Sequence, residues 1–162
     1  MSGNASYPIL EFEREADPKG EWIPMAVRMK LDLVGLKIRL PDWQALTSQD
    51  RASLLALDTE SAAGEEQFGI ALELALAAAG IGPAQTLVPE DAKPDPTNLD
   101  WYAPGPPPEK LERSLRALDR SDLWAMTDRF GRYVLCKLSR KPADPRLAKA
   151  AAELAERAGL DG

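Results

Sequence analysis

Apolar residues recur every three or four positions over most of the chain, which is the spacing of one face of an α-helix. The stripe formed by Leu111, Leu115 and Leu118 is one example. The pattern predicts a mainly α fold, a compact helical domain of about five to seven helices with short extended segments. The predicted helices lie at 24–34, from the Thr47 cap to Leu57, from about Glu65 to Gly80, from Pro108 to Leu118, around Trp124 to Leu138, and from Asp144 to Gly159.

Residues that favour helix ends set the boundaries of these helices. Pro24 suits the first helical turn, and Gly35 suits a C-terminal stop. The last helix is bracketed most clearly, since Asp144 can cap it, Pro145 fits its first position and Gly159 follows its final turn. The sequence therefore predicts a last helix that begins after Asp144 and ends before Gly159.

Three stretches do not follow the helical period. Residues 7–13 place Ile9, Leu10 and Phe12 among carboxylates, which is consistent with a short strand or an extended arm. Residues 36–40 alternate apolar and basic positions, as an extended segment with an exposed basic side would. Residues 83–108 hold eight of the fourteen prolines and predict a semi-rigid connection. The whole of 1–162 is expected to form a single domain.

Composition argues against an independent enzyme. The chain has no histidine and one cysteine, which removes imidazole catalysis, CxxC redox chemistry and most zinc or non-haem iron sites. The adjacent carboxylates of Glu65–Glu66 and Glu90–Asp91 have no spacing that implies a catalytic dyad or metal cage. No catalytic residue, metal site or cofactor is therefore expected.

Charge and hydropathy limit which partners and which cellular compartment are expected. The formal charge of -6 opposes binding to nucleic acid phosphates, and the basic residues are scattered. Residues 1–7 lack the features of a secretory signal, and the longest apolar run, 70–79, is about half of the roughly 20 residues that a membrane span needs. A cytoplasmic protein without a membrane segment or nucleic acid partner is expected, and the oligomeric state is left open.

The spacing of Trp43, Arg51, Leu54 and Leu57 recurs in Trp124, Arg132, Leu135 and Leu138, with Thr47 and Thr127 one position out of register. This pattern suggests a weak internal repeat of a tryptophan-bearing turn followed by a helix. Both tryptophans are expected to pack in the core, with an interface role as the alternative.

Several charged residues are candidates for binding a partner protein. Arg28 and Asp32 stand four positions apart and so share one helix face, where they could recognise a partner or simply form an intrahelical ion pair. Basic side chains nearby could contact phosphate or carboxylate groups, although a simple solvated face is the alternative. The full candidate set is Arg28, Lys30, Asp32, Lys37, Arg39 and Lys137.

Three further residues carry alternative interpretations. Cys136 lies between Leu135 and Leu138 and is expected to be a buried apolar residue rather than a reactive thiol. Trp101, beside prolines, suits docking on another surface or folding back onto its own domain. Trp22 also lies outside the apolar stripes.

Several segments resemble the nitrate reductase-associated protein family. They are Ile23–Asp32, Gly35–Ile38 with Trp43 and Arg51, the later segment Arg132–Arg140, and Leu10–Glu13 near the start. The resemblance implies a small bacterial protein that the molybdenum enzyme assimilatory nitrate reductase, or its precursor, needs in order to become or remain active. The family often has cysteines where this chain has Trp22 and Val34, which argues against a thiol-based cluster.

Two other functions are compatible with parts of the sequence. The capped helix that follows a short turn within 42–57 has helix-turn-helix spacing and could belong to a DNA-binding regulator, which the acidic balance opposes. A small carboxylate-dependent enzyme would need acidic residues that converge from separate helices.

Overall fold

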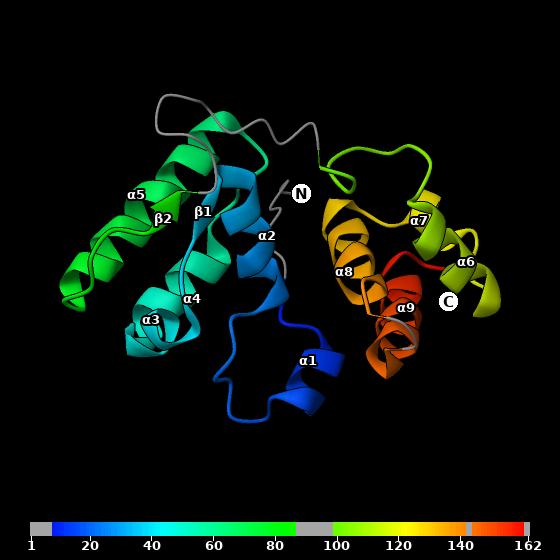
Figure 1. Cartoon of the computed structure of the whole chain (residues 1–162), viewed down its shortest axis with the longest axis horizontal. Coiled ribbons are helices and arrows are strands. Elements are labelled where there is room, and N and C mark those ends of the chain that lie inside the picture. Colours follow the sequence, from blue (N-terminus) through cyan, green and yellow to red (C-terminus); the bar gives the residue numbers. More distant parts are fainter. Residues whose placement is uncertain (1–7, 87–98, 142–143, 161–162) are drawn as a thin grey trace. The chain divides into compact units, whose positions relative to one another are not determined.

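The computed structural model describes residues 8–86, 99–141 and 144–160, and these form nine helices and one two-stranded sheet (Figure 1). The mainly α fold class is thus confirmed. The helices are α1 (Glu11–Ala16), α2 (Met25–Val34), α3 (Leu40–Ala45), α4 (Ser48–Ala56), α5 (Ala62–Ala78), α6 (Glu109–Ala117), α7 (Leu123–Met126), α8 (Arg129–Ser139) and α9 (Pro145–Arg157), and the strands are β1 (Leu36–Lys37) and β2 (Gln85–Thr86).

The chain divides into two compact units. Unit 1 comprises Met1–Ile9 and Asp17–Pro96, and unit 2 comprises Leu10–Ala16 and Thr97–Gly162. Each unit buries its own apolar side chains, and each is described by itself below. The single domain expected over 1–162 stays a prediction.

Unit 1 is built from α2, α4 and α5 packed against one another, with the small sheet beside α2. Strands β1 and β2 are antiparallel, and Leu36 and Lys37 pair with Thr86 and Gln85. The proline-rich connection predicted at 83–108 therefore begins with a short paired strand, while 87–98 lie outside the described residues. The core of the unit gathers Val27, Leu31, Ile38, Trp43, Leu46, Leu54, Phe68, Leu72, Ala75 and Leu76.

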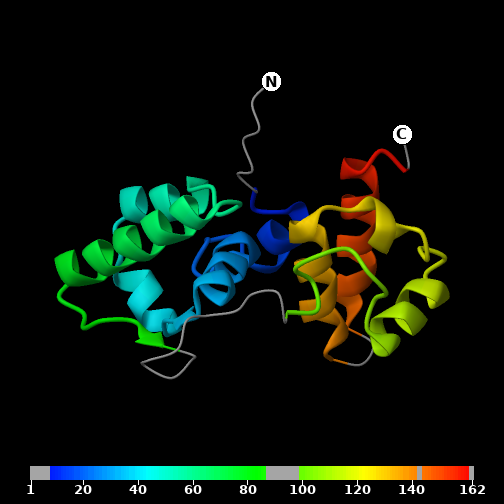
Figure 2. The same cartoon turned by 90° about the horizontal axis from the view of Figure 1, so that it is seen from above.

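Unit 2 is centred on α8, whose residues are almost all buried. Helices α6 and α9 pack on α8, and α7 and α1 pack on α9. Figure 2 shows α8 and α9 side by side, as does Figure 1. The apolar stripe of α6 contributes Leu111 and Leu115, both buried, and α9 contributes Leu147, Ala151 and Leu154.

The predicted helix ends are confirmed at α2 and α9. Pro24 precedes the first residue of α2, and Gly35 follows the last in the left-handed conformation with φ 69°. The side chain of Asp144 accepts a hydrogen bond from the Arg146 amide at 2.9 Å, and Gly159 has φ 79°. Local sequence therefore determines where these helices begin and end.

The segment near the N-terminus was expected to be extended, and this was wrong: Glu11–Ala16 is helical. The carboxylate of Glu153 on α9 accepts hydrogen bonds from the amides of Glu11 at 2.8 Å and Phe12 at 3.2 Å. Glu13 accepts from the Leu10 amide at 2.9 Å. Because a short helix leaves its first amides without internal partners, these carboxylates stabilise the helical form.

Apart from α1 and the two strands, the two units repeat the same order of helices. In unit 1 a helix (α2), a short helix (α3) and two longer helices (α4, α5) follow one another, and in unit 2 α6, α7, α8 and α9 do the same. The N-cap residues Thr47 and Asp128 stand in the same register, 81 residues apart, as do Trp43 and Trp124. The recurring spacing is thus a repeated corner between a short helix and a longer helix. The residue that corresponds to Thr47 in the second corner is Asp128 rather than Thr127.

Candidate functional site

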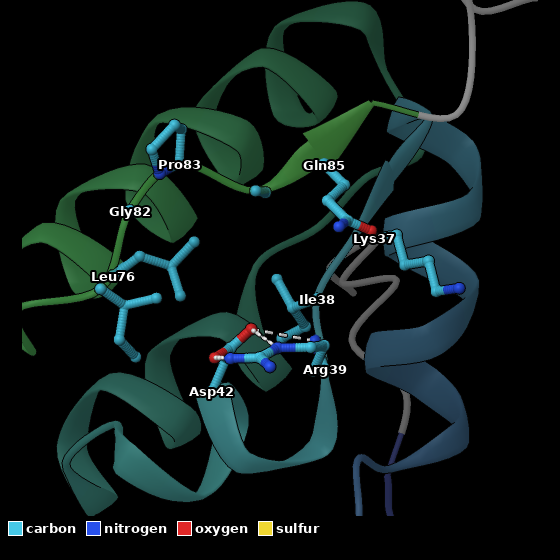
Figure 3. A pocket seen from close by; sticks show the side chains of 10 residues that line it. Lys37, Ile38, Arg39, Asp42, Leu76, Gly82, Pro83 and Gln85 are labelled. Atoms are coloured by element: carbon cyan, nitrogen blue, oxygen red, sulfur yellow. Dashed lines mark hydrogen bonds and ion pairs between the residues drawn. The ribbon is translucent and has the colours of Figure 1, made fainter.

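A cleft of about 260 Å³ lies on unit 1 beside the two strands (Figure 3). Its apolar lining comes from Ile38, Leu76 and Ile81. The end of α5 at Gly80, which has φ 77°, turns the chain back so that residues 81–85 form one side of the cleft. Two candidate binding residues, Lys37 and Arg39, also line the cleft, and Lys37 pairs with Gln85 in the sheet.

The charge of Arg39 is compensated by a neighbouring carboxylate. Its guanidinium lies 3.2 Å from the carboxylate of Asp42, and its amide donates to the same carboxylate at 3.1 Å. These contacts hold the pKa of Asp42 below its usual value. In Figure 3 the Lys37 side chain points away from this pair. The cleft therefore presents a largely neutralised pair and one separate cation, which suits weak contacts with a polar partner surface.

Lys30 is the largest departure from the expected site, because it is fully buried rather than solvated. Its ammonium group donates to the carbonyls of Leu55 at 2.5 Å and Leu54 at 3.3 Å, at the end of α4. Burial lowers the pKa of Lys30 to about 8, and the charge of Asp58 opposes that shift. Lys30 therefore joins α2 to α4 inside unit 1.

The other candidate residues occupy different places. Arg28 is exposed on α2 and Asp32 is partly buried one turn later. Lys137 belongs to unit 2, where its ammonium lies 5.5 Å from the centre of the Tyr133 ring. The structure thus brings Lys37 and Arg39 to one cleft, and the binding role of all six residues stays a prediction.

Cys136 and the tryptophans of the repeat are buried, as expected. Burial raises the pKa of Cys136 to about 12, with Asp100 adding to the shift, so the thiol is not activated. Trp43 and Trp124 are 2% and 4% exposed. Of the two tryptophans outside the stripes, Trp101 folds back into unit 2 and Trp22 is exposed.

The sequence did not reveal that the repeated corner of unit 2 holds a turning, bent segment of chain, residues 101–105. The indole nitrogen of Trp124 donates to the carbonyl of Gly105 at 2.6 Å. The guanidinium of Arg132 donates through Nε to the carbonyl of Trp101 at 3.0 Å. Both donors come from the repeat, so residues 101–105 are fixed by its tryptophan and its arginine.

Further side chains of α8 also contact residues 101 and 102. The Arg129 guanidinium lies 4.0 Å from the centre of the Tyr102 ring, and its Nε donates to the Tyr102 carbonyl at 2.9 Å. The Trp101 ring meets Tyr133 edge to face, with 4.9 Å between the ring centres. Backbone carbonyls and aromatic side chains of this bent segment are therefore recognised together.

The corresponding corner of unit 1 has the same local geometry. Thr47 accepts a hydrogen bond from the Asp50 amide at 3.0 Å, just as Asp128 accepts from Gly131 at 2.8 Å. The residues before these caps, Leu46 and Thr127, are both extended. Within the part of the chain that the structure describes, however, no atom accepts a hydrogen bond from Trp43 Nε1 or Arg51 Nε.

Two further properties concern metals and membranes. Among residues 8–86, 99–141 and 144–160, no three histidine, cysteine, aspartate or glutamate side chains come together in a way that could hold a metal ion. None of the helices formed by these residues has the length and apolar character that crossing a bilayer demands.

Comparison with known proteins gives one match. The model of a family described as conserved nitrate reductase-associated protein matches residues 9–154, which is most of the chain and spans both units. No curated protein and no solved structure matches significantly.

Proposed function

We propose that this chain, which belongs to the conserved nitrate reductase-associated protein family, is a cytoplasmic accessory protein that binds nitrate reductase or its precursor. It supports the maturation or activity of that enzyme and does not itself reduce nitrate. The family match over 9–154 carries the proposal. The lack of histidine and the buried, protonated Cys136 support a role without redox chemistry of its own.

The exposed charges of unit 1 are the proposed contact surface. Arg28 on α2, Lys37 on β1 and Arg39 after it all expose their side chains. Exposed charges at a rim steer association and select partners, although each adds little to affinity. Lys30 supports this surface from inside, by tying α2 to the end of α4.

Deletion of the gene tests the proposal. The deletion strain should grow poorly on nitrate and normally on nitrite or ammonium, because only the nitrate-reducing step is affected. The purified protein alone should reduce no nitrate. Normal growth on nitrate, with parental nitrate reduction in extracts, would refute the accessory role.

Complementation then tests the surface. Lys37→Glu and Arg28→Glu should fold normally and restore growth less well than the wild type, since each reverses an exposed charge. Arg113→Glu, at an exposed position of α6 in unit 2, is the matched control and should restore growth fully. Equal rescue by all three variants would exclude this surface, while the accessory role would be judged by the deletion alone.

A further inference from the structure

The repeated corners differ in one respect. In unit 2, Trp124 Nε1 and Arg132 Nε donate to carbonyls of residues 101–105. In unit 1, the equivalent nitrogens of Trp43 and Arg51 find no acceptor in the described structure. Buried donors without acceptors are uncommon in native proteins, and each needs an explanation. The equivalent two donors therefore have acceptors in unit 2 and lack them among the described residues in unit 1.

The segment of unit 1 that precedes α2 does not supply the missing acceptors. The carbonyl of Glu21 accepts a hydrogen bond from the Gln44 side chain at 3.1 Å. The amides of Glu21 and Trp22 donate to Asp17 at 3.0 and 2.9 Å. The segment before α2 is thus hydrogen-bonded to Gln44 and Asp17. Its counterpart in unit 2 instead accepts hydrogen bonds from the repeated tryptophan and arginine.

The surface beside the unit 1 corner is also open. Helix α4 buries only Leu54 among its residues, whereas α8 buries nine of its eleven. The position equivalent to Tyr133, against which Trp101 packs, is Ala52 in unit 1, and Ala52 is exposed. Where unit 2 has a large ring covered by a segment of chain, unit 1 has a small side chain facing solvent.

We propose that the corner between α3 and α4 binds a bent segment of a partner protein in the way that the corner between α7 and α8 holds residues 101–105. Carbonyls of the bound segment accept hydrogen bonds from Trp43 Nε1 and Arg51 Nε. An aromatic side chain of the segment lies over Ala52. Both nitrogens are buried, so neighbouring side chains shift as the segment enters, which is common when proteins bind.

The built-in segment of unit 2 defines the ligand chemistry. Residues 101–105 read Trp-Tyr-Ala-Pro-Gly, and residues 106–108 are all proline. Proline restricts the backbone of such sequences, so less conformational entropy is lost on binding. The predicted ligand is thus an aromatic residue followed within about four positions by proline and glycine. This site does not depend on nitrate reductase being the partner.

A labelled peptide tests the proposal directly. A fluorescein-labelled peptide with the sequence of residues 99–108 is titrated with the full chain, and fluorescence anisotropy is recorded. We expect a Kd of about 10–100 µM, because a short segment of this kind uses few hydrogen bonds. A peptide of the same composition in scrambled order is the control and should bind at least about tenfold more weakly.

Matched variants locate the site. Trp43→Phe and Arg51→Gln each remove one donor and should weaken binding about tenfold, the effect of losing one hydrogen bond. Trp124→Phe makes the same change in unit 2 and should leave binding unchanged. Circular dichroism establishes that each variant is folded, and Arg51→Lys, which keeps the charge but lacks the Nε donor, provides a second measurement if Arg51→Gln unfolds.

Three results would overturn the proposal. The first is no peptide binding at protein concentrations on the order of 1 mM. The second is wild-type affinity in Trp43→Phe and in the tested Arg51 variant, and the third is loss of binding in Trp124→Phe. Sedimentation of the unlabelled chain tests a second copy as the occupant. A dimer that Trp43→Phe abolishes would replace the partner protein by another copy of this chain.

Discussion

Replacing each repeated tryptophan by phenylalanine should destabilise the two units by different amounts. The ring is shortened equally in both cases, so the loss of apolar contact is similar. Only Trp124 also loses a hydrogen bond, the one from its Nε1 to Gly105 at 2.6 Å. Trp43 Nε1 has no acceptor among the described residues, so its removal costs nothing in hydrogen bonding and relieves a buried donor.

The expected difference can be estimated from that hydrogen bond. A net hydrogen bond contributes about 0.5–1.5 kcal/mol, and a carbonyl left without its donor adds up to about 1–3 kcal/mol. Gly105 is exposed, so water can replace the lost donor and a value near the lower end applies. Trp124→Phe should therefore reduce the free energy of unfolding by about 1–2 kcal/mol more than Trp43→Phe. Truncation to alanine should cost about 3–5 kcal/mol at either position, since both rings are buried.

Urea unfolding followed by far-ultraviolet circular dichroism measures this difference. Tryptophan fluorescence is unsuitable, because the substitution removes one of the four tryptophans that give the signal. If the two units unfold in separate steps, each variant is compared with the wild type in the step of its own unit. Equal losses in the two variants would show that the hydrogen bond to Gly105 adds no stability and would refute the reasoning.

Three further outcomes are expected. The pKa of Lys30 is lowered from 10.5 to about 8, so between pH 8 and 10 the unfolded chain holds more protons than the native chain. The unfolding free energy of the wild type should thus rise over this pH range by about 1–3 kcal/mol relative to that of Lys30→Met. Urea titrations of both proteins at several pH values measure this, and a stability difference between them that does not change with pH would contradict it. Gly131→Ala should lower the unfolding midpoint strongly, because the added Cβ would collide with the Thr127 side chain, and a wild-type midpoint would disprove this. The thiol of Cys136 should react with a thiol reagent at pH 8 only as fast as the chain unfolds, and complete modification within seconds would show that it is accessible.

Helix boundaries could be predicted because their causes are local. The cap of α9 lies in the residues Asp144 and Pro145 themselves, and its end lies in Gly159, so no distant contact is needed. The core positions of Trp43 and Trp124 followed from their place before leucine stripes. Each of these features depends on residues that lie close to one another in the sequence.

The features that escaped prediction depend on distant partners. Helix α1 receives its capping carboxylate from Glu153, which is 142 residues from Glu11. Lys30 looked like a surface residue, yet its ammonium finds carbonyls 24 and 25 residues away at the end of α4. A buried lysine needs such partners, and the apolar period of α2 does not reveal them.

The candidate site was predictable only in part. Alternation in 36–40 indicated an extended, basic segment, and the structure places Lys37 and Arg39 beside a cleft. The ion pair of Arg39 with Asp42 depends on the helix that begins at Leu40. The alternating pattern did not predict this start, because it placed Leu40 in the extended segment. The recurring tryptophan and arginine spacing was visible, but its acceptors lie in a proline-rich stretch without any periodic signal.

The assignment of Leu10–Ala16 to unit 2 has a consequence for how the protein is made. Synthesis proceeds from the N-terminus, so α1 leaves the ribosome early while α9, the helix it packs against, is still to be translated. Unit 1 can form its core from one continuous stretch, 17–86, during this interval. A premature stop before residue 144 would therefore harm the beginning of the protein as well as its end, since α1 would lose the carboxylate of Glu153 and the surface that buries Phe12.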